Sequence, residues 1–134
     1  VRSFTCGERL AGEVLDWLQA LLQKTAGTAE AKGELLVAAE EIVTNIHKYA
    51  QLPAAASITV TAESSSELIV LEVSDPGMAF NPLQDSTRST LGSATAEAEI
   101  GGLGIHLITT LTDQQSYRHE DGCNILRVTK LLGS

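Results

Sequence analysis

The apolar residues change their spacing between residues 50 and 58, and this change limits the fold more than any other feature of the sequence. Apolar residues recur every three or four positions from Leu10 onward, which predicts a helix that ends near Gly27. A second helix starts between Thr28 and Gly33 and stops before Pro53. Its apolar face carries Leu35, Ala39, Ile42, Val43, Ile46 and Ala50.

The spacing then becomes that of strands. Apolar and polar residues alternate over 58–62, and an apolar run over 68–73 follows the polar turn 63–67, which predicts a β-hairpin. Further along, the sequence predicts a short helix over 105–111 and two last strands on either side of the turn 119–122. Short turns between strands imply antiparallel pairing rather than crossover connections. The expected fold class is therefore α+β, with one sheet covered by helices.

Length and charge exclude several classes of function. A chain of 134 residues suits one domain, and nine Lys and Arg against 17 Asp and Glu give a net charge of −8. We therefore expect no nucleic-acid binding, because the chain lacks a basic field. No apolar run approaches the roughly 20 residues of a membrane span, so we expect no membrane insertion. Two cysteines, Cys6 and Cys123, show neither a metal-ligand spacing nor a disulfide framework, which favours the cytoplasm.

Three polar residues share one flank of the second helix. With Leu35 set at zero, Glu41, Asn45 and Lys48 fall at about 240°, 280° and 220° around the helix axis. A carboxylate, an amide and an ammonium beside an apolar stripe can meet a ligand that has one apolar and one charged end. The alternative is a solvated helix face with an i, i+4 contact.

Two further segments have the composition of binding loops. Asp75 ends an apolar strand directly before Pro76-Gly77, where its carboxylate can accept an amino group; the alternative is a plain turn. The glycines of segment 101–104 precede a predicted helix and form a candidate anion site, because glycine lets backbone amides approach a phosphate. The stretch 84–99 between them is polar and has no apolar period.

These segments taken together, in this order, resemble a known superfamily. The runs 41–45, 75–77 and 102–104 resemble the N, G1 and G2 boxes of the GHKL ATP-binding superfamily. Within it, the sequence is similar to the anti-sigma-factor serine kinases of the RsbW type. The segments that carry this similarity are 40–50, 80–82, 101–105 and the closing run 117–126. The resemblance extends from about Leu10 to Leu131.

The resemblance implies a Bergerat-type fold that spans residues 1–134. This fold is a two-layer α/β sandwich, with a mixed, mainly antiparallel sheet, helices on one face and a lid at about residues 83–101. It also implies ATP and Mg²⁺ as ligands. Asp75 would accept the amino group of adenine, Gly77 would leave room for the base, and Asn45 would hold Mg²⁺.

The remaining roles concern the phosphates and the reaction. The resemblance implies that Gly102, Leu103 and Gly104 contact the phosphates, while Arg88 and Lys48 are the candidate cations. Glu41 would be the general base that takes the proton from a serine hydroxyl of a partner protein.

The expected function is a Mg-ATP-dependent protein serine kinase. Its implied substrate is a small antagonist protein of the STAS type, with a further role in sequestering a sigma factor, and the related kinases commonly form homodimers. Two alternatives stay open: an ATP-binding module that captures a partner without significant kinase activity, and the ATP-binding domain of a larger signalling protein. Phosphorylation of a partner separates the first expectation from the module.

Overall fold

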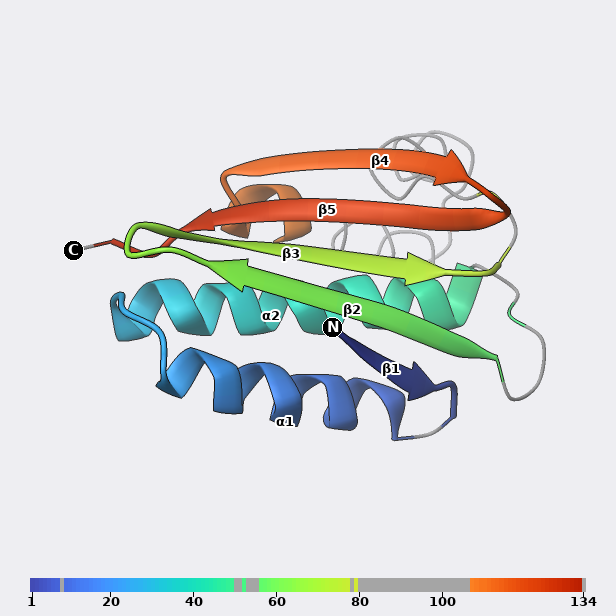
Figure 1. The fold of residues 1–134 in the computed structure, drawn as a ribbon, viewed down its shortest axis with the longest axis horizontal. Coiled ribbons are helices and arrows are strands. Elements are labelled where there is room, and N and C mark those ends of the chain that lie inside the picture. The colour runs from blue at the N-terminus through green and yellow to red at the C-terminus, as the bar shows by residue number, and fades with distance from the viewer. Residues whose placement is uncertain (8, 50–51, 53–55, 78, 80–106, 134) are drawn as a thin grey trace, which may run out of the picture.

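Two helices cover one face of a five-stranded sheet (Figure 1). The computed structural model describes residues 1–7, 9–49, 52, 56–77, 79 and 107–133, with only the backbone described at residues 48 and 49. The strand order is β1-β2-β3-β5-β4, and all four pairings are antiparallel. The elements are β1 (Arg2–Thr5), α1 (Leu10–Gln23), α2 (Ala29–Tyr49), β2 (Ser57–Ser64), β3 (Leu68–Asp75), β4 (Gln114–Glu120) and β5 (Cys123–Leu131). The expected α+β sandwich with helices on one face is confirmed.

Both predicted helices form, although α1 ends at Gln23 rather than near Gly27. The buried residues of α1 are Leu10, Val14, Leu18 and Leu22, which recur every four residues along one face. Helix α2 begins one residue after Thr28, whose Oγ1 accepts a hydrogen bond from the Ala31 N–H at 3.0 Å. This contact satisfies one of the amide groups that a helix start leaves without an intrahelical partner.

Both predicted hairpins are also present. In β3, buried and half-buried residues alternate along the whole strand. The two-residue turn between β4 and β5 consists of Asp121 and Gly122, whose φ angles are 54° and 77°. Positive φ at both positions is typical of the type I′ turn that matches the twist of a hairpin. Of the predicted short helix, residues 107–111 are helical and Ile108 is fully buried.

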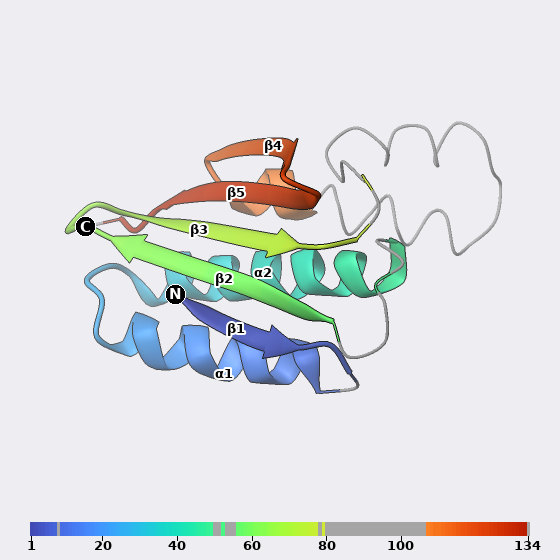
Figure 2. The same ribbon diagram turned by 45° about the vertical axis from the view of Figure 1, so that its right-hand side comes forward.

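Strand β1 is missing from the sequence-based prediction, which begins the fold with a helix. The strand has four residues, and only Phe4 is buried. Its ring packs edge-to-face on Trp17 of α1, with the ring centroids 5.9 Å apart. A single inward residue gives no visible period, so the strand depends on pairing with β2 at the edge of the sheet, beside α1 in Figure 2.

One hydrophobic core lies between the sheet and the helices. Its buried cluster includes residues of α1, α2, β1, β2, β3 and β5, together with Ile108. Across this core, Lys130 of β5 pairs with Glu34 of α2 at 3.3 Å. No helix in the described ranges has both the length and the apolar character needed to cross a bilayer.

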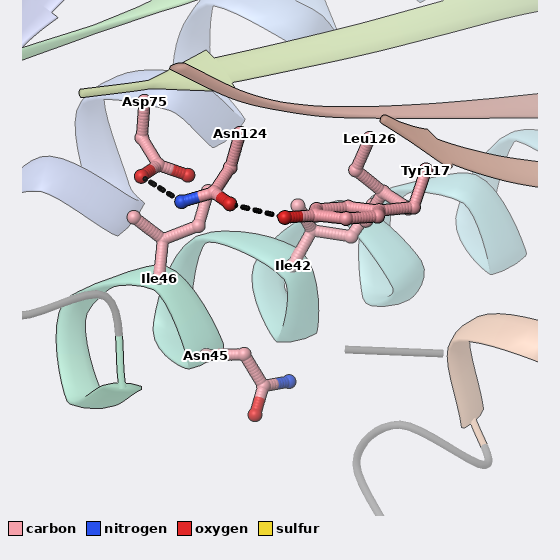
Figure 3. Close-up of a pocket in the computed structure, with 7 residues that line it drawn as sticks. All are labelled: Ile42, Asn45, Ile46, Asp75, Tyr117, Asn124 and Leu126. Atoms are coloured by element: carbon pink, nitrogen blue, oxygen red, sulfur yellow. Dashed lines mark hydrogen bonds between the residues drawn. The ribbon is translucent and has the colours of Figure 1, made fainter. Parts of the chain in front are cut away.

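The register between β3 and β5 positions the candidate site. Asp75, the last residue of β3, lies opposite Asn124 of β5. Residues directly opposite each other in an antiparallel pair project from the same face of the sheet. Both side chains are buried, and Figure 3 shows them above the α2 helix.

Candidate functional site

A buried carboxylate with two hydrogen-bond donors forms one part of the site. Asp75 is 3% exposed. Its Oδ1 accepts hydrogen bonds from the Gly77 N–H at 2.9 Å and from Asn124 Nδ2 at 3.0 Å. The first bond joins the carboxylate to the N–H group two residues further on and so closes an Asx turn. Asp75 is therefore held where β3 leaves the sheet.

A pocket opens beside this carboxylate, between the sheet and α2. Its empty space is about 290 Å³ with open solvent counted, of which about 10 Å³ can hold the centre of a water-sized molecule. Three lining residues come from α2 and four from the strands: Ile42, Asn45, Ile46, Asp75, Tyr117, Asn124 and Leu126. Apolar walls with a few convergent polar groups are typical of a small-molecule site. In this pocket the Asp75 carboxylate can accept an N–H group of a ligand.

Asn45 lines the same pocket, but its side chain points away from Asp75 (Figure 3). Its Nδ2 donates a hydrogen bond to the backbone carbonyl of Glu41 at 2.7 Å. A carbonyl oxygen can only accept, so this bond fixes the amide orientation and directs Oδ1 away from that carbonyl. Asn45 thus offers an oxygen ligand on the side of α2 that faces away from Asp75, and Asp75 offers an acceptor in the pocket.

The single oxygen of Asn45 is compatible with Mg²⁺, which needs few protein ligands. In the part of the chain that the structure describes, no cluster of three or more His, Cys, Asp or Glu residues could hold a metal ion. Mg²⁺ commonly takes one or two protein oxygens and completes its shell with waters and substrate phosphates. The Oδ1 of Asn45 is such an oxygen.

Glu41 lies one turn before Asn45 on the same helix and is half-buried. It does not line the pocket, and its described role is to hold Asn45 through its backbone carbonyl. Glu40 and His47, which the helix geometry places on the opposite flank, are exposed.

The other predicted site residues fall in two groups. Gly77 is buried and uses its N–H to bind Asp75. The Lys48 side chain and all of Arg88, Gly102, Leu103 and Gly104 lie outside the described residues, as does the predicted lid at about 83–101. The structure therefore places Gly77 against Asp75, while Asn45 and Asp75 line one pocket with the Asn45 side chain directed away from Asp75.

Sequence reasoning gave no role to Tyr117 or Asn124, although both line the pocket. For Asn124 the sequence contains a weak indication of such a role. Asn124 occupies an inward position of β5, in line with buried Leu126 and Val128. An amide at the inward position of a strand needs a polar partner inside the protein, and that requirement points to Asp75.

Cys6 interacts electrostatically with Asp75. The side chain is half-buried and packs against the core. Burial raises the pKa of the Cys6 thiol, and the negative charge of Asp75 raises it further, because both disfavour the thiolate. The neutral thiol therefore persists to higher pH than in a free cysteine, and Cys6 is expected to react slowly with alkylating reagents.

This coupling gives a test of the local charge. Asp75→Asn removes the carboxylate charge, so we expect the pKa of Cys6 to fall and its alkylation by iodoacetamide to accelerate at a fixed pH. The measurement uses a Cys123→Ser background, which leaves Cys6 as the one reactive cysteine of the sequence. An unchanged or slower rate in Asp75→Asn would show that the carboxylate does not act on the thiol.

Comparison with known proteins agrees with this geometry. The chain is 28% identical over 120 residues to the serine/threonine-protein kinase BtrW of Bordetella bronchiseptica, a match that covers 89% of this chain and 84% of BtrW. The fold of this chain is similar to that of the Acinetobacter baumannii histidine kinase AdeS, with a TM-score of 0.53 and 11% identity. That match covers 100% of this chain and 69% of the AdeS chain. Residues 7–130 match the histidine kinase-like ATPase domain, so the chain belongs to this family of ATP-binding domains.

Proposed function

We propose that this domain is a Mg-ATP-dependent protein serine kinase of the anti-sigma-factor type. It would phosphorylate a serine of a small STAS-type antagonist protein and also sequester a sigma factor. The observation that carries the proposal is the single pocket lined by both Asp75 and Asn45. The similarity to BtrW, itself named a serine/threonine-protein kinase, supports the choice of reaction.

Adenine recognition is assigned to Asp75 and the apolar walls. The carboxylate accepts a hydrogen bond from the exocyclic amino group, and Gly77 keeps the turn beside it small. Ile42, Ile46 and Leu126 cover the base and remove its faces from water.

Binding of the ATP phosphates is assigned to Asn45 and to segments outside the described residues. Asn45 would hold Mg²⁺ through Oδ1, and the bound ion would neutralise charge on the phosphates. Lys48 and Arg88 would add positive charge, while Gly102, Leu103 and Gly104 would present backbone amides to the phosphates. The lid at about 83–101 would exclude water from the reacting groups.

Glu41 would serve as the general base. Its carboxylate takes the proton from the partner's serine hydroxyl as that oxygen attacks the γ-phosphorus. The new P–O bond forms to serine, the bond to the bridging oxygen breaks, and ADP leaves with the electron pair. Phosphoryl transfer depends mainly on positioning and charge neutralisation, so one oriented carboxylate, one Mg²⁺ and a few cations would suffice.

One observation favours a second candidate function. Glu41 does not line the pocket, and its described hydrogen bond uses the backbone carbonyl rather than the carboxylate. A module that binds ATP and captures a partner without transferring phosphate needs no base at this position. The two candidates differ in product: the kinase leaves phosphoserine on the partner, whereas the module leaves ATP unconsumed.

The test combines binding with transfer. Isothermal titration is expected to show ATP binding that is tighter with Mg²⁺ than with EDTA. Asn45→Ala is expected to weaken Mg-ATP binding at least about tenfold and to remove the difference between the two conditions. Thr44→Ala, one residue earlier on α2 and outside the pocket, is the matched control.

Transfer is measured with ATP labelled in the γ-phosphate and STAS-domain proteins from the same genome. Phosphoserine on one of them supports the kinase. Nucleotide-dependent binding of such a protein with no phosphoserine supports the capture module instead. If neither ATP nor ADP binds in the presence of Mg²⁺, both candidate functions are wrong.

A further inference from the structure

Hydrogen bonds connect an aromatic residue of β4 to the carboxylate of β3 through β5. The Tyr117 hydroxyl donates to Asn124 Oδ1. Asn124 Nδ2 donates to Asp75 Oδ1 at 3.0 Å and reaches the Gly77 carbonyl oxygen at 3.4 Å. Figure 3 shows these three side chains in a row along one wall of the pocket. Asn124 and Asp75 are 4% and 3% exposed, so water provides little substitute for these bonds.

Two of the partners of Asn124, Tyr117 and Asp75, favour one orientation of its amide. With Nδ2 toward Asp75, the amide donates to the carboxylate and its Oδ1 accepts from Tyr117. The reversed amide would set its oxygen against Asp75 Oδ1, where two acceptors repel each other. The Tyr117 hydroxyl stabilises this orientation, because it donates a hydrogen bond to the oxygen of the amide.

The consequence appears at the other oxygen of Asp75. Both hydrogen bonds that Asp75 accepts from described residues end on Oδ1, from Gly77 and Asn124. Oδ2 accepts none from the described part of the chain, and Asp75 lines the pocket. An ionised carboxylate has acceptor capacity on both oxygens. Fixing Oδ1 therefore fixes the direction in which Oδ2 faces a ligand.

We propose that Asn124, oriented by Tyr117, is a positioning residue that makes the pocket select purines with an amino group at position 6. This inference rests on the proposed contact between Asp75 and adenine. A 6-amino group donates to the fixed Oδ2, whereas a 6-oxo group presents an acceptor to it and a 6-hydrogen presents no polar group. A site built around a hydrogen bond discriminates against analogues that cannot make it, because its buried polar group is then left without a partner.

The test measures discrimination rather than affinity alone. Dissociation constants are measured on the whole chain for ATP, for inosine triphosphate, which has a 6-oxo group, and for purine riboside triphosphate, which has none. Asn124→Asp keeps the shape of the side chain but replaces the amide donor with a second carboxyl group beside Asp75. Tyr117→Phe keeps the ring and removes the hydroxyl. Gln114→Glu, at an exposed position of β4, is the matched amide-to-carboxylate control.

Wild type and the Gln114→Glu control are expected to prefer ATP over both analogues. Asn124→Asp is expected to reduce this preference at least about tenfold, and Tyr117→Phe by about threefold, by weakening ATP more than the analogues. A merely structural role would weaken all three nucleotides equally. A preference for ATP that is unchanged in both variants would therefore overturn the positioning role and leave the proposed function standing.

Two other outcomes also test the positioning role of Asn124. If wild type binds ATP and the analogues equally, the contact between Asp75 and adenine is wrong, and the positioning role falls with it. If Asn124→Asp does not fold, as judged by thermal unfolding, Tyr117→Phe carries the test. A reduced preference for ATP in Tyr117→Phe then supports the inference, and an unchanged preference overturns it.

Discussion

Asp75→Asn is expected to weaken ATP binding at least about 100-fold without unfolding the domain. The asparagine Oδ1 can still accept from the Gly77 N–H and from Asn124 Nδ2, the two donors that hold the aspartate. Its amide nitrogen then replaces Oδ2 and directs N–H groups at the amino group of adenine. Two donors facing each other inside a buried site lose the bond and leave polar groups without partners.

The measurement is isothermal titration with Mg-ATP, together with thermal unfolding of each variant. Asp113→Asn is the control, because it makes the same charge change at an exposed carboxylate outside the pocket. Asparagine at 113 can keep the hydrogen bond that Oδ2 now accepts from the Leu131 N–H. ATP affinity in Asp75→Asn equal to that of the control would show that this carboxylate does not recognise the base.

Glu41→Gln is expected to slow phosphoryl transfer by about 10²- to 10⁴-fold, the usual contribution of a general base. ATP affinity is expected to change little. The reason is local: the group that holds the Asn45 amide is the backbone carbonyl of residue 41, and this carbonyl is the same in glutamate and glutamine. The substitution therefore removes the base and leaves the proposed Mg²⁺ ligand in place.

Single-turnover transfer from Mg-ATP to the partner serine measures this effect, and titration of the same samples measures ATP binding. Glu40→Gln is the matched control, because Glu40 is the neighbouring residue and is exposed. Equal transfer rates for Glu41→Gln and wild type would remove Glu41 from the mechanism. A large loss of ATP affinity in Glu41→Gln would instead assign the carboxylate to nucleotide binding.

Much of the fold could be predicted because its elements have local signals. The four-residue recurrence of α1, the alternation along β3 and the Asp121-Gly122 turn each depend on residues close together in the chain. Strand β1 has no such signal. It is one short strand at the sheet edge, and pairing with β2 and contact with α1 determine its conformation.

The candidate site also has one part that the sequence predicts and another part that only the tertiary structure decides. The sequence alone made candidates of Asp75, at the point where a strand meets a Pro-Gly turn, and of Asn45, on the flank of an apolar helix stripe. The tertiary structure decided that both line one pocket, and that Asn124, 49 residues from Asp75 along the chain, donates to its carboxylate. The physical reason is that a hydrogen bond between distant residues depends on which strands are neighbours and in what register. That register follows from packing the whole core, which no local pattern in the sequence encodes.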